Sequence, residues 1–239
     1  MISLHSVYNR INITKESYTT LEVPGNFVML LRKQIDGGII RSMEQIGLDR
    51  ILHMEIEARN EMGDIHVKHF YVELMGKYAN VVLVDEDMRI IDALKRIPPF
   101  ENNSRTIHPG AAYVLPAPHV GKQDPFHHEA FDLEESFTKQ FHGFSPLLSK
   151  EMQYRIKQGQ SFDEVMQEIA SSNQLYISDV EDNMFFHCIP LLHLGAHYRV
   201  YPLMKGMDIY FIIKKTETAV KTASKRIEDS IKDAAQGIR

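Results

Sequence analysis

An acid and a guanidinium stand side by side at Asp49 and Arg50, within the stretch GLDRILHMEIEARNEMGD. A third charged group, Glu73, directly precedes Leu74 and Met75. An arginine fork suits bidentate recognition of a phosphate or a base edge, and a carboxylate accepts hydrogen bonds from exocyclic amino groups. A surface that carries both could read RNA bases as well as the RNA backbone. The structural alternative is a solvated salt bridge, which contributes little to stability.

More cationic side chains follow further along the chain, and they are candidate phosphate contacts: Lys95, Arg96 and Arg105. Neighbouring strands usually pair in sequence order, so Asp49-Arg50 and Glu73 to Met75 are expected to share one region of a sheet. The formal net charge is −5. Any contact with nucleic acid is therefore expected to be local rather than spread over the whole surface.

Motifs of nucleotide-binding loops, zinc proteases and serine hydrolases are missing from the sequence, so we expect no enzyme and no cofactor. Zinc-binding residue types do gather at His187, Cys188, His193 and His197. Their spacing matches no structural zinc site, and Pro190 would break a helix that aligned them. Ordinary strand and turn histidines are the favoured interpretation. A single cysteine also excludes an intramolecular disulfide framework.

The elements that must position Asp49 and Glu73 are mostly strands. Alternating apolar residues predict strands in GIIRSMEQIG, DRILHMEIEAR and IHVKHFYVELM. The stretch NVVLVDEDMRIIDAL predicts a hairpin closed by three acidic residues. Before these strands, Pro24 to Asn26 and Gly37-Gly38 bound a predicted helix of about three turns. Its buried stripe should contain Phe27, Leu30, Leu31 and Ile35.

The pattern changes after a turn-rich stretch that ends near Gly121. Helical periodicity appears in HEAFDLEESFTKQ, SPLLSKEMQYRIKQG and SFDEVMQEIASS, and strand-like runs return in QLYISDVEDNMFFHCIPLLHL. Residues 209–232 then predict one polar helix. Its sparse apolar stripe is narrow, as in the first turns of a coiled coil, and consists of Ile213, Val220, Ile227 and Ile231.

Composition limits the class of protein. The 239 residues are enough for one large domain or two small ones, and 44% hydrophobic with 25% charged residues is ordinary for a globular protein. No apolar run approaches the ~20 residues that span a bilayer. The N-terminal residues MISLHSVYNR lack the layout of a signal peptide. We therefore expect a cytoplasmic protein with no membrane partner.

Several motifs, in order and spacing, closely resemble the N-terminal region of the NFACT family: HSVYNRINIT, FVMLLRKQIDGGII, QIGLDRI, NEMGD, VELMGKYANVVLVDEDMRIIDALKRI and RTIHPGAAYVLP. This family includes proteins first described as fibronectin- or fibrinogen-binding and later understood as ribosome quality control factors. The stretch GFSPLLSKEMQYR resembles the family's helix-hairpin-helix segment, and TETAVKTASKRIEDSIKD resembles the start of its coiled coil.

The resemblance implies an α+β fold in three parts. Residues 1–122 would form a β-rich domain similar to the N-terminal domain of formamidopyrimidine-DNA glycosylase. Residues 123–212 would form a helix-hairpin-helix domain with short strands, and 213–239 the start of a coiled coil. The family's first helix and strands are expected to be missing ahead of HSVYNRINIT, and its RNA-binding domain beyond the coiled coil.

The resemblance also implies a role without catalysis. The partners would be tRNA and the large ribosomal subunit that still carries an obstructed peptidyl-tRNA, and the outcome C-terminal alanine tailing of stalled nascent chains. The family residues tied to tRNA handling match Asp49, Arg50, Glu73, Leu74 and Met75. One alternative is a surface adhesin that binds fibronectin or fibrinogen, which would need an unconventional route of export. A non-functional fragment is another. DNA glycosylase activity is disfavoured because the chain begins Met1-Ile2 rather than with a proline amine.

Overall fold

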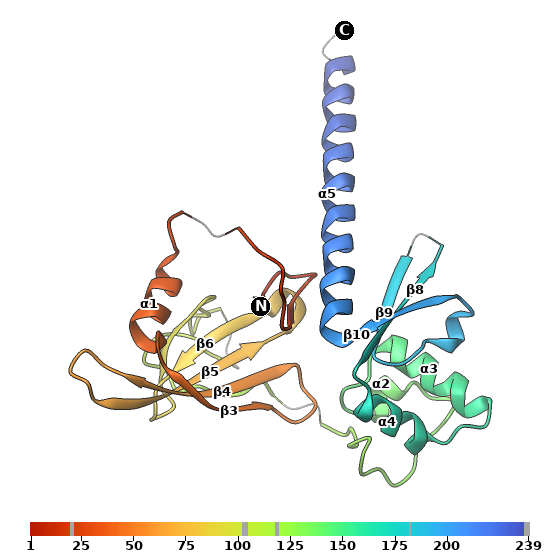
Figure 1. The fold of residues 1–239 in the computed structure, drawn as a ribbon, viewed down its shortest axis with the longest axis horizontal. Helices are drawn as coiled ribbons and strands as arrows, with labels where there is room; N and C mark the ends of the chain where they lie inside the picture. The colour runs from red at the N-terminus through yellow and green to blue at the C-terminus, as the bar shows by residue number, and fades with distance from the viewer. Residues whose placement is uncertain (20–21, 102–104, 118–119, 182, 237–239) are drawn as a thin grey trace. The chain divides into compact units, whose positions relative to one another are not determined.

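The computed structural model describes residues 1–19, 22–101, 105–117, 120–181 and 183–236, with side chains described up to 219 and at 222. The chain divides into two compact units. The first contains Met1–Ile11 and Ser17–Ser145, and the second contains Asn12–Glu16 and Pro146–Arg239. Both units combine antiparallel sheets with helices, so the expected α+β class is confirmed (Figure 1). The three-part division at residues 122 and 212 stays a prediction.

A five-stranded antiparallel sheet forms the centre of the first unit, and its strands follow one another in sequence order. The strands are β3 (Ile39–Gln45), β4 (Ile51–Arg59), β5 (Ile65–Glu73), β6 (Asn80–Val84) and β7 (Ile90–Ala93). The strands β3 to β5 lie where the alternating pattern predicted them, and β6 and β7 are the arms of the predicted hairpin. A separate pair of short strands, β1 (Ile2–Ser3) and β2 (Arg10–Ile11), precedes the sheet.

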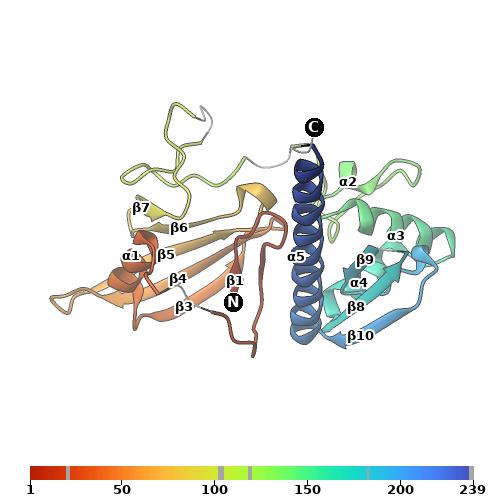
Figure 2. The same cartoon turned by 90° about the horizontal axis from the view of Figure 1, so that it is seen from above.

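The two faces of this sheet are covered by different segments. Helix α1 (Asn26–Ile35) lies on one face (Figure 2). Its half-buried residues Phe27, Leu30, Leu31 and Ile35 pack against the sheet, on the predicted stripe. On the other face, Tyr113 and Ile107 cover Ile51, Tyr71 and Val82. The segment that follows β7 is therefore the second cover of the sheet, although it contains only isolated bridges and no helix among its described residues.

The predicted helix over HEAFDLEESFTKQ is largely wrong. Only α2 (Phe137–Gln140) is helical there. The side chain of Gln140 accepts a hydrogen bond from the Asp132 backbone N–H at 2.8 Å and donates to the carbonyls of Asp132 and Glu135. Asp132 Oδ1 accepts from the backbone N–H of Glu134. Such local side-chain bonds compete with the helical ones, and they hold this stretch as a loop.

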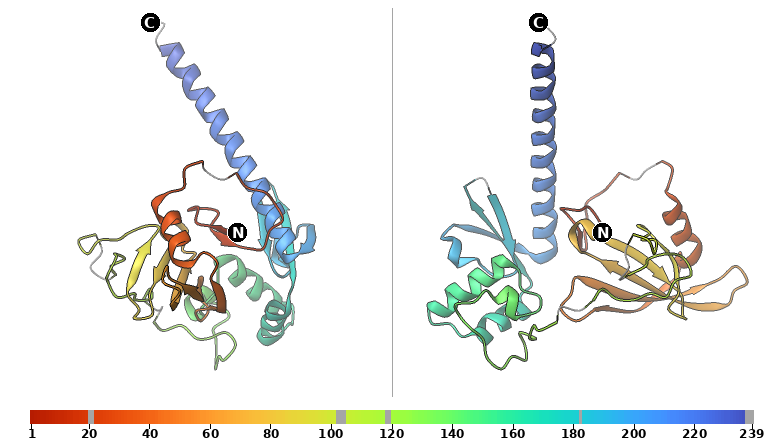
Figure 3. Two further views of the ribbon diagram at one scale, coloured as in Figure 1. Left: turned by 60° about the vertical axis from the view of Figure 1, so that its left-hand side comes forward. Right: turned by 180° about the vertical axis from the view of Figure 1, so that it is seen from behind.

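The second unit begins with two helices, α3 (Pro146–Lys157) and α4 (Phe162–Ser171). Ser161 and Glu164 form a reciprocal capping box at the start of α4, and it satisfies two backbone N–H groups there. A three-stranded antiparallel sheet follows, in the order β10-β8-β9, and α5 continues directly from β10 (Figure 3). These elements are β8 (Gln174–Val180), β9 (Asn183–His187), β10 (Tyr198–Pro202) and α5 (Leu203–Gln236).

Helix α5 confirms the predicted polar helix and begins six residues earlier than expected, at Leu203. Val220, Ile227 and Ile231 of the predicted stripe lie outside the described side chains, so the coiled coil stays a prediction. Near its start, α5 comes very close to β8 at Gly206, which is buried. Within the described part of the chain, no helix combines the length and the apolar character that a bilayer crossing requires.

Candidate functional site

The turn between β3 and β4 carries Asp49 and Arg50. Its backbone is closed by a bond from Ile46 N–H to the Ile51 carbonyl at 2.9 Å and by one from Asp49 N–H to the Ile46 carbonyl at 3.1 Å. Gly47 has a φ of +54°, a left-handed conformation that suits glycine. The Gln45 side chain also donates to the Asp49 carbonyl at 2.9 Å. The turn is therefore held by hydrogen bonds to its backbone, and the side chains of Asp49 and Arg50 take no part in these bonds.

Within the described part of the chain, neither charged group of this dipeptide is paired. Among the described residues, no hydrogen bond or ion pair reaches the Asp49 carboxylate or the Arg50 guanidinium. Arg50 is exposed and Asp49 is half-buried. The two side chains do not form the salt bridge that the structural alternative required. Both charges remain available to a ligand.

Strand pairing brings the second motif to the same place. Ile51, the first residue of β4, lies opposite Glu73, the last residue of β5. The backbone N–H of Leu74 donates to the Arg50 carbonyl at 2.8 Å. The expectation that both motifs share one region of a sheet is confirmed. Leu74 packs toward the α1 side of the sheet, whereas Met75 packs on the opposite side.

The Glu73 carboxylate is buried and bonded to other side chains of the protein. Only 2% of the residue is exposed, and its carboxylate accepts hydrogen bonds from both terminal nitrogens of Arg105 and from the Tyr113 hydroxyl at 2.8 Å. Arg105 also donates through Nε to the Val114 carbonyl at 2.7 Å. Burial opposes the charge on Arg105, but the ion pair with Glu73 prevails and raises the arginine pKa. Glu73 and Arg105 thus support this end of the sheet from within.

The other predicted cations remain closer to solvent. Arg96 is exposed and makes a bidentate pair with Asp92, with both bonds at 2.8 Å. The hydrogen bond from Arg96 lowers the pKa of Asp92. Lys95 is exposed, and its ammonium donates to the Lys77 carbonyl at 3.3 Å.

Two further exposed residues join this region, and the sequence interpretation missed them. Lys77 and Tyr78 lie in the short 3-10 helix η1 (Gly76–Tyr78), which directly follows Met75. The Lys77 ammonium lies 4.9 Å from the centre of the Tyr78 ring, and Tyr78 is 68% exposed. Their position immediately after the Glu-Leu-Met motif was a usable signal. The sheet end thus combines exposed cations with an exposed aromatic ring.

The clustered histidines of the second unit occupy strand and turn positions. His187 ends β9, and burial lowers its pKa to about 4, so it is neutral at physiological pH. His193 lies in the 3-10 helix η2 (Leu192–Leu194), where its Nδ1 is 2.6 Å from the buried Glu151 carboxylate. Over the residues that the structure describes, no three histidine, cysteine or acidic side chains come together as metal ligands.

Sequence and structure comparisons agree on the kinship of the chain. A protein "Rqc2 homolog RqcH" from Bacillus subtilis (strain 168) is 34% identical over a 250-residue alignment that covers 95% of this chain and 43% of that protein. A protein of the same description from Streptococcus suis is 38% identical over 127 residues, which cover 53% of this chain and 23% of that protein. The chain therefore spans less than half the length of these relatives.

Two solved structures share the fold. The N-terminal part of the fibronectin/fibrinogen-binding protein from Streptococcus suis has a TM-score of 0.73 and 26% identity, and the match covers 88% of this chain and 81% of that one. The fibrinogen-binding protein from Staphylococcus aureus has a TM-score of 0.69 and 28% identity, with coverage of 84% and 77%. The family description "NFACT N-terminal and middle domains" matches residues 1–238, and the chain therefore belongs to the NFACT family.

Proposed function

We propose that this chain is the tRNA-handling region of a ribosome quality control factor. It would bind tRNA together with an obstructed large ribosomal subunit and support C-terminal alanine tailing of the stalled nascent chain. The observation that carries the proposal is the Asp49-Arg50 dipeptide, whose charged groups have no partner among the described residues. It stands beside Glu73, Leu74 and Met75 at one end of the five-stranded sheet. The similarity of the chain to RqcH proteins supports the same role.

Each group in the proposed site has a distinct task. The Arg50 guanidinium donates to a phosphate or to a base edge, while the Asp49 carboxylate accepts from base amino groups. Lys77 and Lys95 add phosphate contacts, and the exposed Tyr78 ring offers a surface on which a base can stack. Arg96 contributes a weaker contact because Asp92 already occupies its fork. Glu73 and Arg105 hold the strand end in position.

The remaining parts of the chain receive family roles within the same proposal. Helices α3 and α4, which are joined by a short turn, would be the helix-hairpin-helix motif of a domain over residues 123–212. The distal part of α5 would open a coiled coil, and the sheet of the first unit would correspond to the glycosylase-like domain. A factor that acts on ribosomes would work in the cytoplasm.

The names of the structural relatives favour a second function. Two similar solved structures are described as binding fibrinogen or fibronectin. Adhesion to such a protein is therefore the alternative that an experiment must address directly.

The test is a charge exchange that keeps net charge constant. Asp49→Arg combined with Arg50→Asp should weaken tRNA binding about tenfold or more, since a good bidentate contact contributes about 1–3 kcal/mol. Arg41→Glu combined with Glu57→Arg is the matched control, because this exposed pair lies on the same sheet. Binding to labelled tRNA and to immobilised fibronectin is measured after circular dichroism shows that all variants fold. Unchanged tRNA affinity in the folded Asp49/Arg50 variant would refute the site, and fibronectin binding without tRNA binding would favour adhesion.

A further inference from the structure

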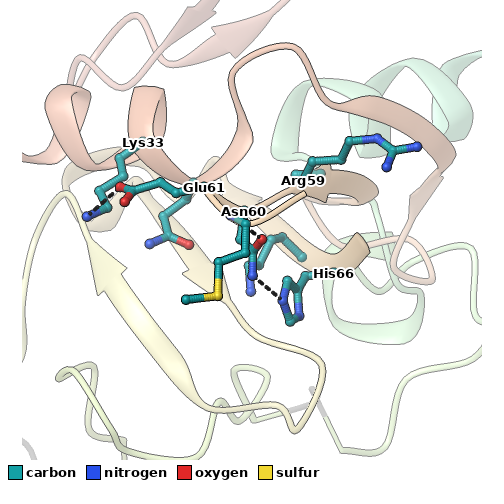
Figure 4. A pocket seen from close by; sticks show the side chains of 9 residues that line it. Lys33, Arg59, Asn60, Glu61 and His66 are labelled. Atoms are coloured by element: carbon teal, nitrogen blue, oxygen red, sulfur yellow. Dashed lines mark hydrogen bonds and ion pairs between the residues drawn. The ribbon is translucent and has the colours of Figure 1, made fainter. Parts of the chain in front are cut away.

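A cavity lined by several charged side chains lies at the opposite end of the β4–β5 hairpin from Asp49 and Arg50. It has a volume of about 360 Å³ and is bounded by the end of α1 and by the NEMGD turn (Figure 4). Its lining residues include Lys33, Gln34, Arg59, Asn60, Glu61 and Lys68. All of them belong to the first unit. The proposed tRNA site does not use this turn.

The turn is organised by one asparagine. Asn60 Oδ1 accepts hydrogen bonds from the backbone N–H groups of Met62 and Asp64, both at 2.9 Å. Its Nδ2 lies 3.1 Å from the Asp64 carboxylate and 3.2 Å from His66 Nε2. Gly63 has a φ of +90° and donates to the Asn60 carbonyl at 3.0 Å. One wall of the cavity is therefore held in shape before any ligand arrives.

Positive charge is concentrated in this cavity. Three cationic side chains and one carboxylate line it, in a chain whose formal net charge is −5. The Lys68 ammonium has no hydrogen-bond or ion-pair partner among the described residues. Lys33 lies 3.2 Å from Glu61, but these side chains are 68% and 84% exposed. Because such exposed pairs are weak, an incoming anion can displace Glu61 from Lys33.

The lining chemistry indicates a phosphate rather than a base. Apart from the imidazole of His66, no aromatic ring is among the lining residues, so a base would find little to stack on. Lys33 and Lys68 supply two ammonium groups, and Gln34 adds an amide donor. Arg59 runs away from the other lining side chains in Figure 4, and its Nη1 donates to the Gly63 carbonyl at 3.1 Å. The two lysines are therefore the principal anion ligands.

We propose that this cavity binds a phosphate group, which a bound RNA strand presents through its backbone. The nine residues of β4 separate the cavity from Asp49-Arg50 by about 30 Å, because a strand rises ~3.3 Å per residue. One rigid hairpin would then contact the same RNA at both of its ends. The identity of the phosphate carrier rests on the proposed function, whereas the phosphate site itself does not.

Salt-dependent binding of the full chain to labelled tRNA tests the RNA contact. The double variant Lys33→Gln with Lys68→Gln should reduce the slope of log K against log salt by ~0.7 to 0.9 for each phosphate that is no longer neutralised. Glu61→Gln should have the opposite effect and raise affinity, because it removes the competing carboxylate. The control, Lys15→Gln with Lys139→Gln, removes two exposed lysines elsewhere and should leave the slope unchanged.

Titration with inorganic phosphate and with AMP distinguishes the source of the phosphate. Amide chemical shifts of Gly63 and Asp64 are followed in the unmodified chain and in the Lys33/Lys68 variant. Suppose that the shifts saturate in the unmodified chain and are absent from the variant, while both chains have the same slope of log K for tRNA against log salt. The cavity then binds a small phosphate compound and not RNA. A changed tRNA slope assigns it to RNA, even if the Asp49/Arg50 exchange leaves affinity intact and the proposed function fails. An unchanged slope together with no phosphate response overturns the inference.

Discussion

Glu73 and Arg105 are 32 residues apart in the chain and meet beneath Tyr113. The Arg105 guanidinium carbon lies 5.4 Å from the centre of the Tyr113 ring, which stacks in turn on Tyr71 with 4.1 Å between ring centres. A buried ion pair enclosed in this way is costly to break, because the surviving charge cannot return to water. Asp49, on the neighbouring turn, has no such partner among the described residues.

Glu73→Gln should therefore lower the free energy of unfolding by about 3–5 kcal/mol, since it leaves the Arg105 side chain, which is only 14% exposed, without a counter-charge. Glu57→Gln is the control: its partner Arg41 is half-exposed, and the expected decrease is below about 1 kcal/mol. Both are measured by urea denaturation. Equal decreases would mean that Glu73 is not buried as described. A tRNA-binding defect in Glu73→Gln must accordingly be interpreted together with its stability.

The site was only partly predictable from single residues. Strand order alone was enough to place Asp49-Arg50 beside Glu73, because both motifs lie at the ends of strands that follow one another. The pairing of Glu73 with Arg105 was not predictable. It depends on how the segment after β7 folds back over the sheet through the bridge between Ile97 and Ile107, and local periodicity carries no information about that path.

Among the elements, strands and helices with a repeating apolar pattern were predictable, including α5 with its sparse stripe, whereas the path of the loop that precedes α2 was not. The strand β4 and the stripe of α1 follow from spacing, because each turns its apolar residues toward the core of the sheet. The strand β3 is exposed along its whole length and β6 is buried along its whole length, so their apolar residues indicate the strands without indicating one buried face. The stretch that precedes α2 has a helical period, but Asp132 and Gln140 satisfy its backbone through their side chains. These local side-chain hydrogen bonds outweigh the helical propensity of the stretch.

Helix α5 approaches β8 so closely at Gly206 that no side chain fits between them. A Cβ added at Gly206 would lie 2.7 Å from Leu175 Cβ and 3.2 Å from Tyr201 Cβ. Gly206→Ala should therefore destabilise the second unit by about 1–3 kcal/mol, although alanine is intrinsically better in a helix by ~1 kcal/mol. Lys205→Ala, one residue earlier and exposed, should be nearly neutral. Thermal unfolding compares the two, and an alanine at 206 that stabilises the protein would exclude this close approach.

At the scale of the whole molecule, neither unit is continuous in sequence. Residues 12–16 belong to the second unit, although the residues on both sides of them belong to the first. They are attached to α5 through Asp208, whose carboxylate accepts from Asn12 Nδ2 at 2.9 Å and from Thr14 Oγ1 at 2.8 Å. The partners are 196 and 194 residues apart, a separation at which a sequence pattern cannot indicate pairing.

Asp208→Ala should release residues 12–16 from α5. Asp208 is 8% exposed, and hydrogen bonds to a charged acceptor contribute ~1.5–3 kcal/mol each, so the second unit should be destabilised by about that much or more. Asp179→Ala is the control, because Asp179 pairs with Arg199 in an exposed salt bridge of the same unit. Hydrogen exchange should show faster exchange at residues 12–16 and along the start of α5, while the sheet β3 to β7 keeps its protection. Equal exchange in both variants would show that Asp208 does not hold the segment.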